Sequence, residues 1–540
     1  MARIGHGEID LRTRTGPAGG PGPASVRVAA DGGAASIGLA AESGFTPPPG
    51  HTRYGYMFPQ LQQDAGDRLP DGPATLEALK RLGELLVDAP EESPVGGALG
   101  KGDSRIPSAY TYLGQFIDHD ITFDQGSATI VQLGSSTLAP LASLDGLANA
   151  RSCRLDLDRV YAGAPRDGDR LRIGRVTPLN GTAPPLLPVP GKSPLNDLPR
   201  QSRSTDARTD RAALIGDPRN DENTIVAQLH TAFLKAHNAL VAEGREFDAA
   251  MRALRQRYQH MVLHDFLEAQ VCDPEVIADV LASGPRFWRL GNATELFMPA
   301  EFAVAAYRFG HSMIRSLYDF NLNFEPANLG LLFTFTALSG ELGQDIGLPP
   351  EQTETLPENW VIQWERFLPL DGATPQRARK IDCRLSDFTF DLRNTFGRPQ
   401  SDTETDPQAK RIASILATRN LLRGFLFRLP TGQAVARSLG ETALEGDSLL
   451  DALPTDAIRA AAEPFASRTP LWFYLLAEAG DPSGANGEHL GRVGSRILGE
   501  TFWNLVRFSN DSVLNPEVEL DFERFTLSDL VTLAGREDGA

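Results

Sequence analysis

Long segments with apolar residues at helical spacing constrain the fold of this chain most strongly. The clearest of them are 75–90, 223–244, 251–270, 300–318, 410–427 and 491–508. Few segments alternate apolar and polar residues with the period of two that a half-buried strand requires. A chain of 540 residues can bury a large core. The sequence therefore predicts a mainly α fold with little β-structure.

The N-terminal fifty residues differ in composition from the rest. Residues 1–50 are rich in glycine, alanine and proline, which predicts an extended or mobile arm. A long irregular section follows at 126–215, and no internal repeat is visible. We therefore expect an N-terminal arm followed by one large domain over residues 51–540.

The overall charge limits the possible partners. The formal net charge is -18 at pH 7, which argues against binding to nucleic acid or to an anionic membrane. The longest apolar run, at 329–338, is too short to cross a bilayer. The N-terminus lacks the apolar core of a signal peptide. We expect a soluble protein that is cytoplasmic or exported by a non-classical route.

A polar stretch beside apolar side chains is the strongest candidate for a site. The sequence GQFIDHDITFD, residues 114–124, carries one glutamine, one histidine and three carboxylates. On a helix, Gln115, Asp118 and His119 share one face. Asp120 lies about 140° around the helix from Gln115 and serves something else. Taken alone, the pattern also fits a capped helix end with a hydrogen-bonded histidine.

A second candidate is the histidine in AAYRFGHSMIRS, residues 305–316. Gly310 lets a flat ligand approach the backbone before His311, and Arg308 places a cation nearby. A haem iron needs an axial imidazole, and its propionates need cations. Read alone, the segment fits an ordinary histidine at a helix interface at least as well as it fits an axial haem ligand.

The stretch IGDPRNDENTI, residues 215–225, predicts a helix start. Asp217 is suited to be the N-cap, with Pro218 at the first helical position. Arg219 and Glu222 are then neighbours at i and i+3. In isolation this is a capped helix with a surface ion pair.

The segment RSCRLDLDRVYAG, residues 151–163, has the composition of a calcium loop. Its polar groups occur at every second position and would point to one side of an extended loop; they are Ser152, Arg154, Asp156 and Asp158. Calcium binds six to eight oxygens from carboxylates, hydroxyls and carbonyls. Asp120 is the natural candidate for one further carboxylate. Alone, an Asp-x-Asp sequence is usually a solvated loop.

Together these motifs resemble the animal-type haem peroxidases of the peroxidase–cyclooxygenase superfamily. The family pattern G-Q-x-x-D-H-D reads from Gly114 to Asp120, R-x-x-E reads Arg219 and Glu222, and R-x-G-H reads Arg308 to His311. The segment Asn420-Leu-Leu-Arg423 matches the family's proximal asparagine region. The order of the motifs along the chain makes the resemblance far more specific than any single motif.

The resemblance implies a large single-domain fold, haem b and calcium, with a role for each residue. His119, Arg219 and Gln115 would be catalytic, and His311 would bind the iron. The other haem-binding residues would be Asp118, Glu222, Arg308, Asn420 and Arg423, with Asp118 and Glu222 forming ester bonds to haem and Asn420 accepting the N–H of His311. Calcium would be bound by Asp120, Ser152, the carbonyl of Arg154, Asp156 and Asp158.

The resemblance also implies an activity and leaves two alternatives open. Hydrogen peroxide would oxidise a small reducing substrate through a ferryl haem. Asn223 stands where myeloperoxidase has its haem-linked methionine, so iodide, bromide, thiocyanate or phenols are expected as donors rather than chloride. One alternative is a haem fatty-acid dioxygenase; Tyr307 lies one position from the family's radical tyrosine, and on a regular helix it would point away. The other is a non-enzymatic haem- or calcium-binding protein.

Overall fold

The computed structural model describes most of the chain beyond the N-terminal fifty residues. The described residues are 51–88, 100–123, 138–178, 189, 193–205, 209–333, 335–336, 342, 354–387, 411 and 414–539. The predicted arm at 1–50 lies outside them, and that prediction stays untested. None of the helices in this described part combines the length and the apolar character that crossing a bilayer requires.

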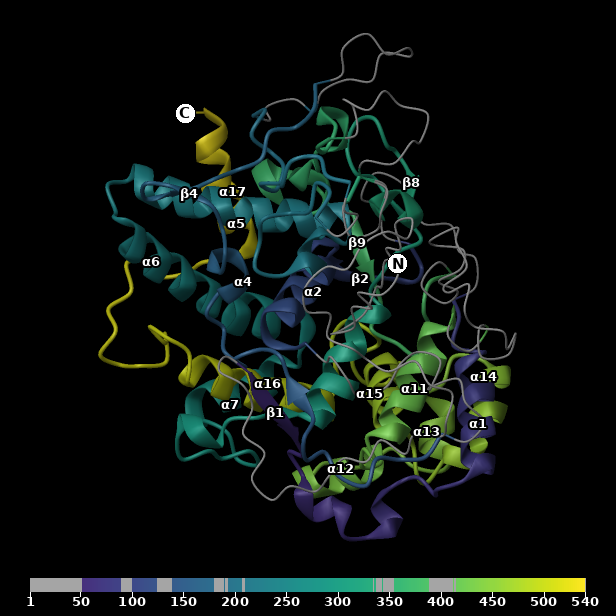
Figure 1. Ribbon diagram of the computed structural model, residues 1–540. Coiled ribbons are helices and arrows are strands. Elements are labelled where there is room, and N and C mark those ends of the chain that lie inside the picture. Colours follow the sequence, from purple (N-terminus) through teal and green to yellow (C-terminus); the bar gives the residue numbers. More distant parts are fainter. Residues whose placement is uncertain are drawn as a thin grey trace.

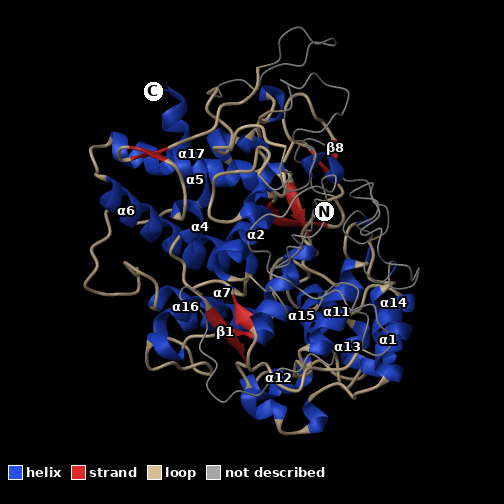
Figure 2. Cartoon of the chain, viewed as in Figure 1, coloured by secondary structure: helices blue, strands red, loops and turns tan. Residues whose placement is uncertain are grey.

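Helices dominate the described chain (Figure 2). The α-helices are α1 (Pro73–Gly83), α2 (Ala109–Ile121), α4 (Asp158–Tyr161), α5 (Thr224–Ala242), α6 (Phe247–His260), α7 (Pro274–Ser283), α11 (Leu416–Leu426), α12 (Gly432–Leu439), α13 (Asp447–Asp451), α14 (Asp456–Ala462), α15 (Leu471–Gly480), α16 (Arg492–Arg507) and α17 (Leu527–Gly535). The predicted mainly α class is therefore confirmed.

The strands are short and tie distant segments together. They are β1 (Thr52–Gly55), β2 (Asp103–Pro107), β3 (Ala148–Asn149), β4 (Arg166–Asp167), β5 (Arg170–Leu171), β6 (Met298–Pro299), β7 (Leu317–Tyr318), β8 (Ala327–Asn328) and β9 (Arg377–Arg379). In one sheet β1 pairs antiparallel with β3 and parallel with β6. β2, which ends directly before α2 begins, pairs antiparallel with β9.

Helix α5 runs through the middle of one half of the molecule. Asn223 caps it by accepting a hydrogen bond from the amide of Val226 at 3.0 Å. Almost every residue of α5 is buried, because α2, α6 and α17 all pack against it (Figure 1). A helix that is buried all round belongs to the core of a large protein, and α5 thereby fixes the position of α2.

The first helix of the described chain packs among late ones. α1 contacts α11 and α14, so the purple α1 lies beside green and yellow-green helices at the lower right of Figure 1. In this group α11 also contacts α15 and the segment before His311. The contacts hold α11 beside His311.

The segment 300–318 is not the single regular helix that its sequence predicts. A π-helix spans Glu301–Ala305, and a 3-10 helix spans Ala306–His311. Between them Ala305 leaves the helical region at φ -127° and ψ -70°. β7 then begins at Leu317. Because π- and 3-10 turns advance by different angles, the side chains after Ala305 leave the phase of an α-helix.

Candidate functional site

A cavity of about 540 Å³ separates α2 from the end of the 3-10 helix Ala306–His311. Gly114, Gln115 and Asp118 line it on the α2 side. Gly310 and His311 line it on the opposite side. The cavity thus joins two of the motifs singled out in the sequence.

The cavity follows one face of α2, as predicted for Gln115 and Asp118. Tyr110 and Thr111 extend this face by one turn toward the N-terminus of the helix. His119 is buried at 1% exposure but is not among the lining residues. It lies about 100° around the helix from Asp118, so it stands at the edge of the shared face.

His119 is oriented by a chain of buried hydrogen bonds. Its Nδ1 lies 2.7 Å from Oδ1 of Asn220, and Nδ2 of Asn220 lies 2.9 Å from Nδ1 of His230. Since an amide oxygen only accepts, Nδ1 of His119 carries the ring proton and Nε2 carries the lone pair. Burial and the charge of Arg219 lower the pKa of His119 to about 4. His119 is therefore a neutral imidazole at pH 7.

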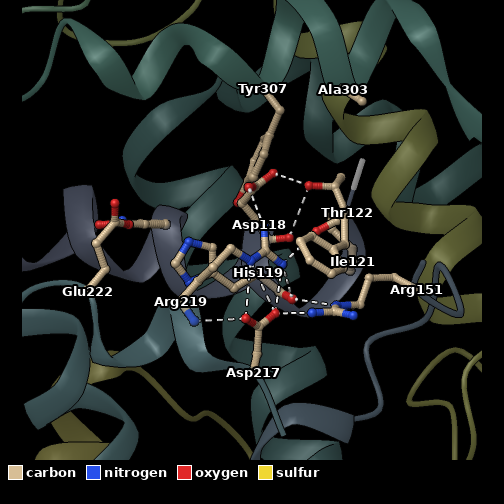
Figure 3. Close-up of polar contacts among 12 residues, drawn as sticks. Asp118, His119, Ile121, Thr122, Arg151, Asp217, Arg219, Glu222, Ala303 and Tyr307 are labelled. Atoms are coloured by element: carbon tan, nitrogen blue, oxygen red, sulfur yellow. Dashed lines mark hydrogen bonds and ion pairs between the residues drawn. The ribbon is translucent and has the colours of Figure 1, made fainter. Parts of the chain in front are cut away.

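Arg219 belongs to a buried cluster of charges around Asp217. Its Nη2 donates to Oδ2 of Asp217 at 2.7 Å and to the carbonyl oxygens of His119 and Thr122 at 3.0 and 2.8 Å. Nη2 of Arg151 also donates to Asp217. Figure 3 shows both guanidinium groups directed at this carboxylate. The cluster ties the end of α2 to the segment before α5.

The N-cap role predicted for Asp217 is confirmed. Its side chain accepts from the amide of Arg219 at 2.9 Å, and a 3-10 helix spans Pro218–Asp221. The alternative of a surface ion pair is excluded, because Arg219 is 2% exposed and Glu222 is 1% exposed. Nη1 of Arg219 lies 4.0 Å from Oδ2 of Asp118 instead.

Glu222 lies next to the cavity through Gln115. Nε2 of Gln115 donates to Oε2 of Glu222 at 3.4 Å, and Nδ2 of Asn223 donates to Oε1 of Gln115 at 3.1 Å. Oδ1 of Asp118 accepts from Oγ1 of Thr122 at 2.8 Å. The two carboxylates predicted to flank the ligand are thus both buried beside the Gln115 face.

The second buried histidine is also held by an asparagine, but with the opposite polarity to the one predicted. Nδ2 of Asn420 donates to Nδ1 of His311 at 2.9 Å. Nη1 of Arg308 donates to Oδ1 of Asn420 at 3.1 Å and thereby fixes the orientation of the amide. The ring proton of His311 then lies on Nε2. A nitrogen that binds a metal must carry no proton. Iron binding through Nε2 therefore requires the Asn420 amide to rotate, so that its oxygen accepts a hydrogen bond from Nδ1.

The other basic residues predicted to bind haem are both buried. Arg308 also donates from Nε to the carbonyl oxygen of Ala303 at 3.1 Å. Arg423 lies on α11, less than one turn after Asn420, and is 2% exposed. Neither residue lines the cavity in this structure.

Tyr307 does not point away from the site, contrary to the prediction from helical phase. It lines the cavity, and its hydroxyl donates to the carbonyl oxygen of Gly114 at 3.1 Å. Figure 3 shows the side chain directed toward Asp118. Burial and the charge of Asp118 raise the pKa of Tyr307 well above its usual value. The change from π- to 3-10 helix at Ala305 accounts for the difference.

The predicted calcium residues are brought together only in part. Oγ of Ser152 donates to Oδ2 of Asp158 at 3.2 Å. Burial and the charge of Asp158 raise the pKa of Asp120 to about 8, so these carboxylates interact. Asp156 turns elsewhere, because its oxygens accept from the amide and from Nδ2 of Asn510, both at 2.8 Å.

Left-handed backbone explains why the segment predicted to bind calcium does not present all its oxygens to one side. Cys153 and Leu157 have φ values of 54° and 55°, and α4 begins at Asp158. The expected extended alternation is therefore wrong. No group of three or more His, Cys, Asp or Glu side chains is arranged to hold a metal within the described ranges.

Several residues of the site escaped the sequence analysis. Asn220 and Arg151 show no helical or motif signal of their own, since their partners come from distant segments. Tyr112 and Phe266 line the cavity but look like ordinary core residues in the sequence. Phe266 belongs to a second π-helix, Met261–Val271, and π-turns often occur at functional sites.

Comparison with known proteins agrees with the motifs. The family model for animal haem peroxidase matches residues 136–335, a segment that includes Arg219, Glu222 and His311. The resemblance seen in the sequence is confirmed. The 114–120 motif and Asn420 lie outside the matched residues.

The individual relatives of this chain are distant. A peroxidase-like protein of Margaritifera margaritifera is 28% identical over 193 residues, which is 32% of this chain and 22% of that protein. The match thus spans about a fifth of the relative's length.

Solved structures give the fold. Peroxidase A from Dictyostelium discoideum superposes with a TM-score of 0.51 at 14% identity, over 86% of this chain and 89% of that one. A fatty acid alpha-dioxygenase of Oryza sativa gives 0.48 at 15% identity, over 88% and 77%. The first likeness supports the animal peroxidase fold; at this identity it says nothing about activity.

Proposed function

We propose that the chain is a haem peroxidase whose haem occupies the cavity between α2 and His311. The observation that carries the proposal is one cavity with the buried, asparagine-held His311 in its wall, and with a second buried, asparagine-held histidine, His119, directly after the lining residue Asp118 in the sequence. A Cβ built on Gly310 meets no atom within 4 Å. The wall therefore leaves space beside His311 for a flat group, and the residues fit haem.

Each residue of the cavity would contribute one task. His311 would bind the iron, and Asp118 and Glu222 would flank the porphyrin. When bound, haem supplies an iron that peroxide can oxidise and that a donor then reduces. His119 would accept a proton from peroxide at Nε2 and return it to the departing oxygen. Arg219, whose Nη1 lies 4.0 Å from Oδ2 of Asp118, would stabilise the negative charge that develops on the departing oxygen.

Activity profiling tests the proposed function. The haem-loaded chain should consume hydrogen peroxide while oxidising iodide, bromide, thiocyanate or a phenol. The half-buried polar side chain of Gln115 at the cavity suits small polar donors. Absence of peroxide consumption with every one of these donors would refute the peroxidase assignment.

We also propose ester bonds from Asp118 and Glu222 to haem. Both carboxylates are buried beside Gln115, as such bonds would require. After brief peroxide treatment, acid extraction should leave haem on the polypeptide. The double variant Asp118→Asn, Glu222→Gln should release it. Complete release of unmodified haem from the unaltered chain would contradict the proposal.

A calcium ion at Asp120, Ser152 and Asp158 is proposed from their proximity. Asp156 would have to leave Asn510 to join them. Metal analysis after mild dialysis should find about one calcium per chain. Asp120→Ala should lower the melting temperature and alter the haem spectrum, whereas Asp167→Ala, in the exposed strand β4, should do neither. Equal behaviour of the two variants would exclude the site.

One observation favours a second function, oxygenation of a fatty acid. Tyr307 lines the cavity, so a tyrosine able to lose a hydrogen atom is available there. We expect no oxygen uptake with linoleate, since the Tyr307 hydroxyl is engaged by Gly114. Oxygen uptake that disappears in Tyr307→Phe but persists in Tyr318→Phe would replace the peroxidase assignment by the dioxygenase one.

A further inference from the structure

A second hollow, of about 670 Å³, lies where the segment after the 3-10 helix Ala65–Asp67 meets the end of α11. Arg68, Arg428 and Arg468 all line it. It shares no lining residue with the first cavity. It is therefore a separate feature of the molecule.

The charge of this hollow opposes that of the whole chain. The chain carries 52 basic and 70 acidic residues, yet three arginines and a single carboxylate, Asp71, line the hollow. Asp71 is exposed, and its Oδ2 lies 3.3 Å from Nη2 of Arg428. An exposed pair of this kind neutralises little, so the hollow keeps a net positive charge.

Two of the arginines, Arg68 and Arg468, have side-chain N–H donors available for a ligand. Within the described part of the chain, the side chains of Arg68 and Arg468 make no hydrogen bond and no ion pair. Nε of Arg68 is moreover buried from solvent. A buried donor without an acceptor is costly, which favours a ligand that supplies one.

Backbone and side-chain contacts hold the segments of Arg68 and Arg428 in place. Arg68 forms a β-bridge with Pro430, and the amide of Thr431 donates to the carbonyl oxygen of Asp67 at 2.7 Å. Nε of Arg428 donates to the carbonyl oxygen of Leu141 at 2.8 Å. The hollow is therefore preformed, and little ordering of the chain would oppose binding.

The remaining wall is apolar. Leu69, Phe425 and Leu429 line the hollow beside the arginines. An arginine guanidinium matches a carboxylate with two parallel hydrogen bonds, while the apolar wall would cover a hydrocarbon body. We propose that this hollow binds a small organic carboxylate with an apolar body.

Saturation-transfer NMR with benzoate as the probe tests the proposal on the full haem-loaded chain. Benzoate should bind saturably. Acetate and benzyl alcohol should bind at least about tenfold more weakly, because acetate lacks the apolar ring and benzyl alcohol lacks the carboxylate. Arg68→Gln and Arg468→Gln should each weaken benzoate binding by about tenfold or more. Arg437→Gln, at an exposed ion pair on α12, is the matched control and should change nothing.

Three results would overturn the site. Equal binding of benzoate and acetate would show general attraction of anions. Unchanged binding in both arginine variants would place benzoate elsewhere. Loss of binding in Gln115→Ala, with the arginine variants unaffected, would assign benzoate to the first cavity. None of these results depends on peroxidase activity.

Discussion

Replacing Asp217 by alanine is expected to lower the free energy of unfolding by about 3–5 kcal/mol. The carboxylate is fully buried and lies between the guanidinium groups of Arg151 and Arg219. Removing one partner of a buried ion pair leaves an uncompensated buried charge, which accounts for the size of the effect. The N-cap bond to the amide of Arg219 is lost as well. Chemical denaturation of the two proteins measures the difference.

A matched control separates burial from charge pairing. Asp167 pairs with Arg172 at 2.9 Å, but their side chains are 67% and 54% exposed. Asp167→Ala should leave the stability nearly unchanged, because solvent screens an exposed pair. A loss at Asp217 no larger than the loss at Asp167 would show that the cluster does not stabilise the fold.

The same carboxylate predicts a dependence of stability on pH. Burial alone would raise the pKa of Asp217, but Arg219 and Arg151 outweigh it and lower the pKa far below its usual value. As the pH falls, Asp217 therefore becomes protonated in the unfolded chain before it does so in the folded one. The contribution to stability is complete above about pH 5 and is lost as the pH falls below about 4. Asp217→Ala should remove that part of the acid sensitivity.

The helical class and the α2 face could be predicted because they depend on local spacing. Gln115 and Asp118 line one cavity because residues three apart share a face of a regular helix. The N-cap at Asp217 is equally local. The motif order also predicts that α2, the 218–222 segment and His311 form one site; of these, α2 and His311 line the same cavity.

What the sequence could not predict depends on departures from regular geometry and on distant partners. The predicted direction of the Tyr307 side chain is wrong because the chain changes from π- to 3-10 helix at Ala305. The polarity at His311 was wrong because Arg308 takes the oxygen of Asn420. Asp156 does not lie with the other predicted calcium ligands, because it accepts a hydrogen bond from Asn510, which is far along the chain.

The proton-transfer role of His119 is the central claim, and its replacement tests that claim most directly. Haem-loaded His119→Ala should oxidise iodide with hydrogen peroxide about 10²–10⁴ times more slowly than the unaltered chain, as expected for loss of an acid–base group. The haem absorbance should persist, since His311 is unchanged. His264→Ala, at a partly exposed histidine of the π-helix Met261–Val271, should leave the rate unchanged. Equal rates in His119→Ala and His264→Ala would contradict the account.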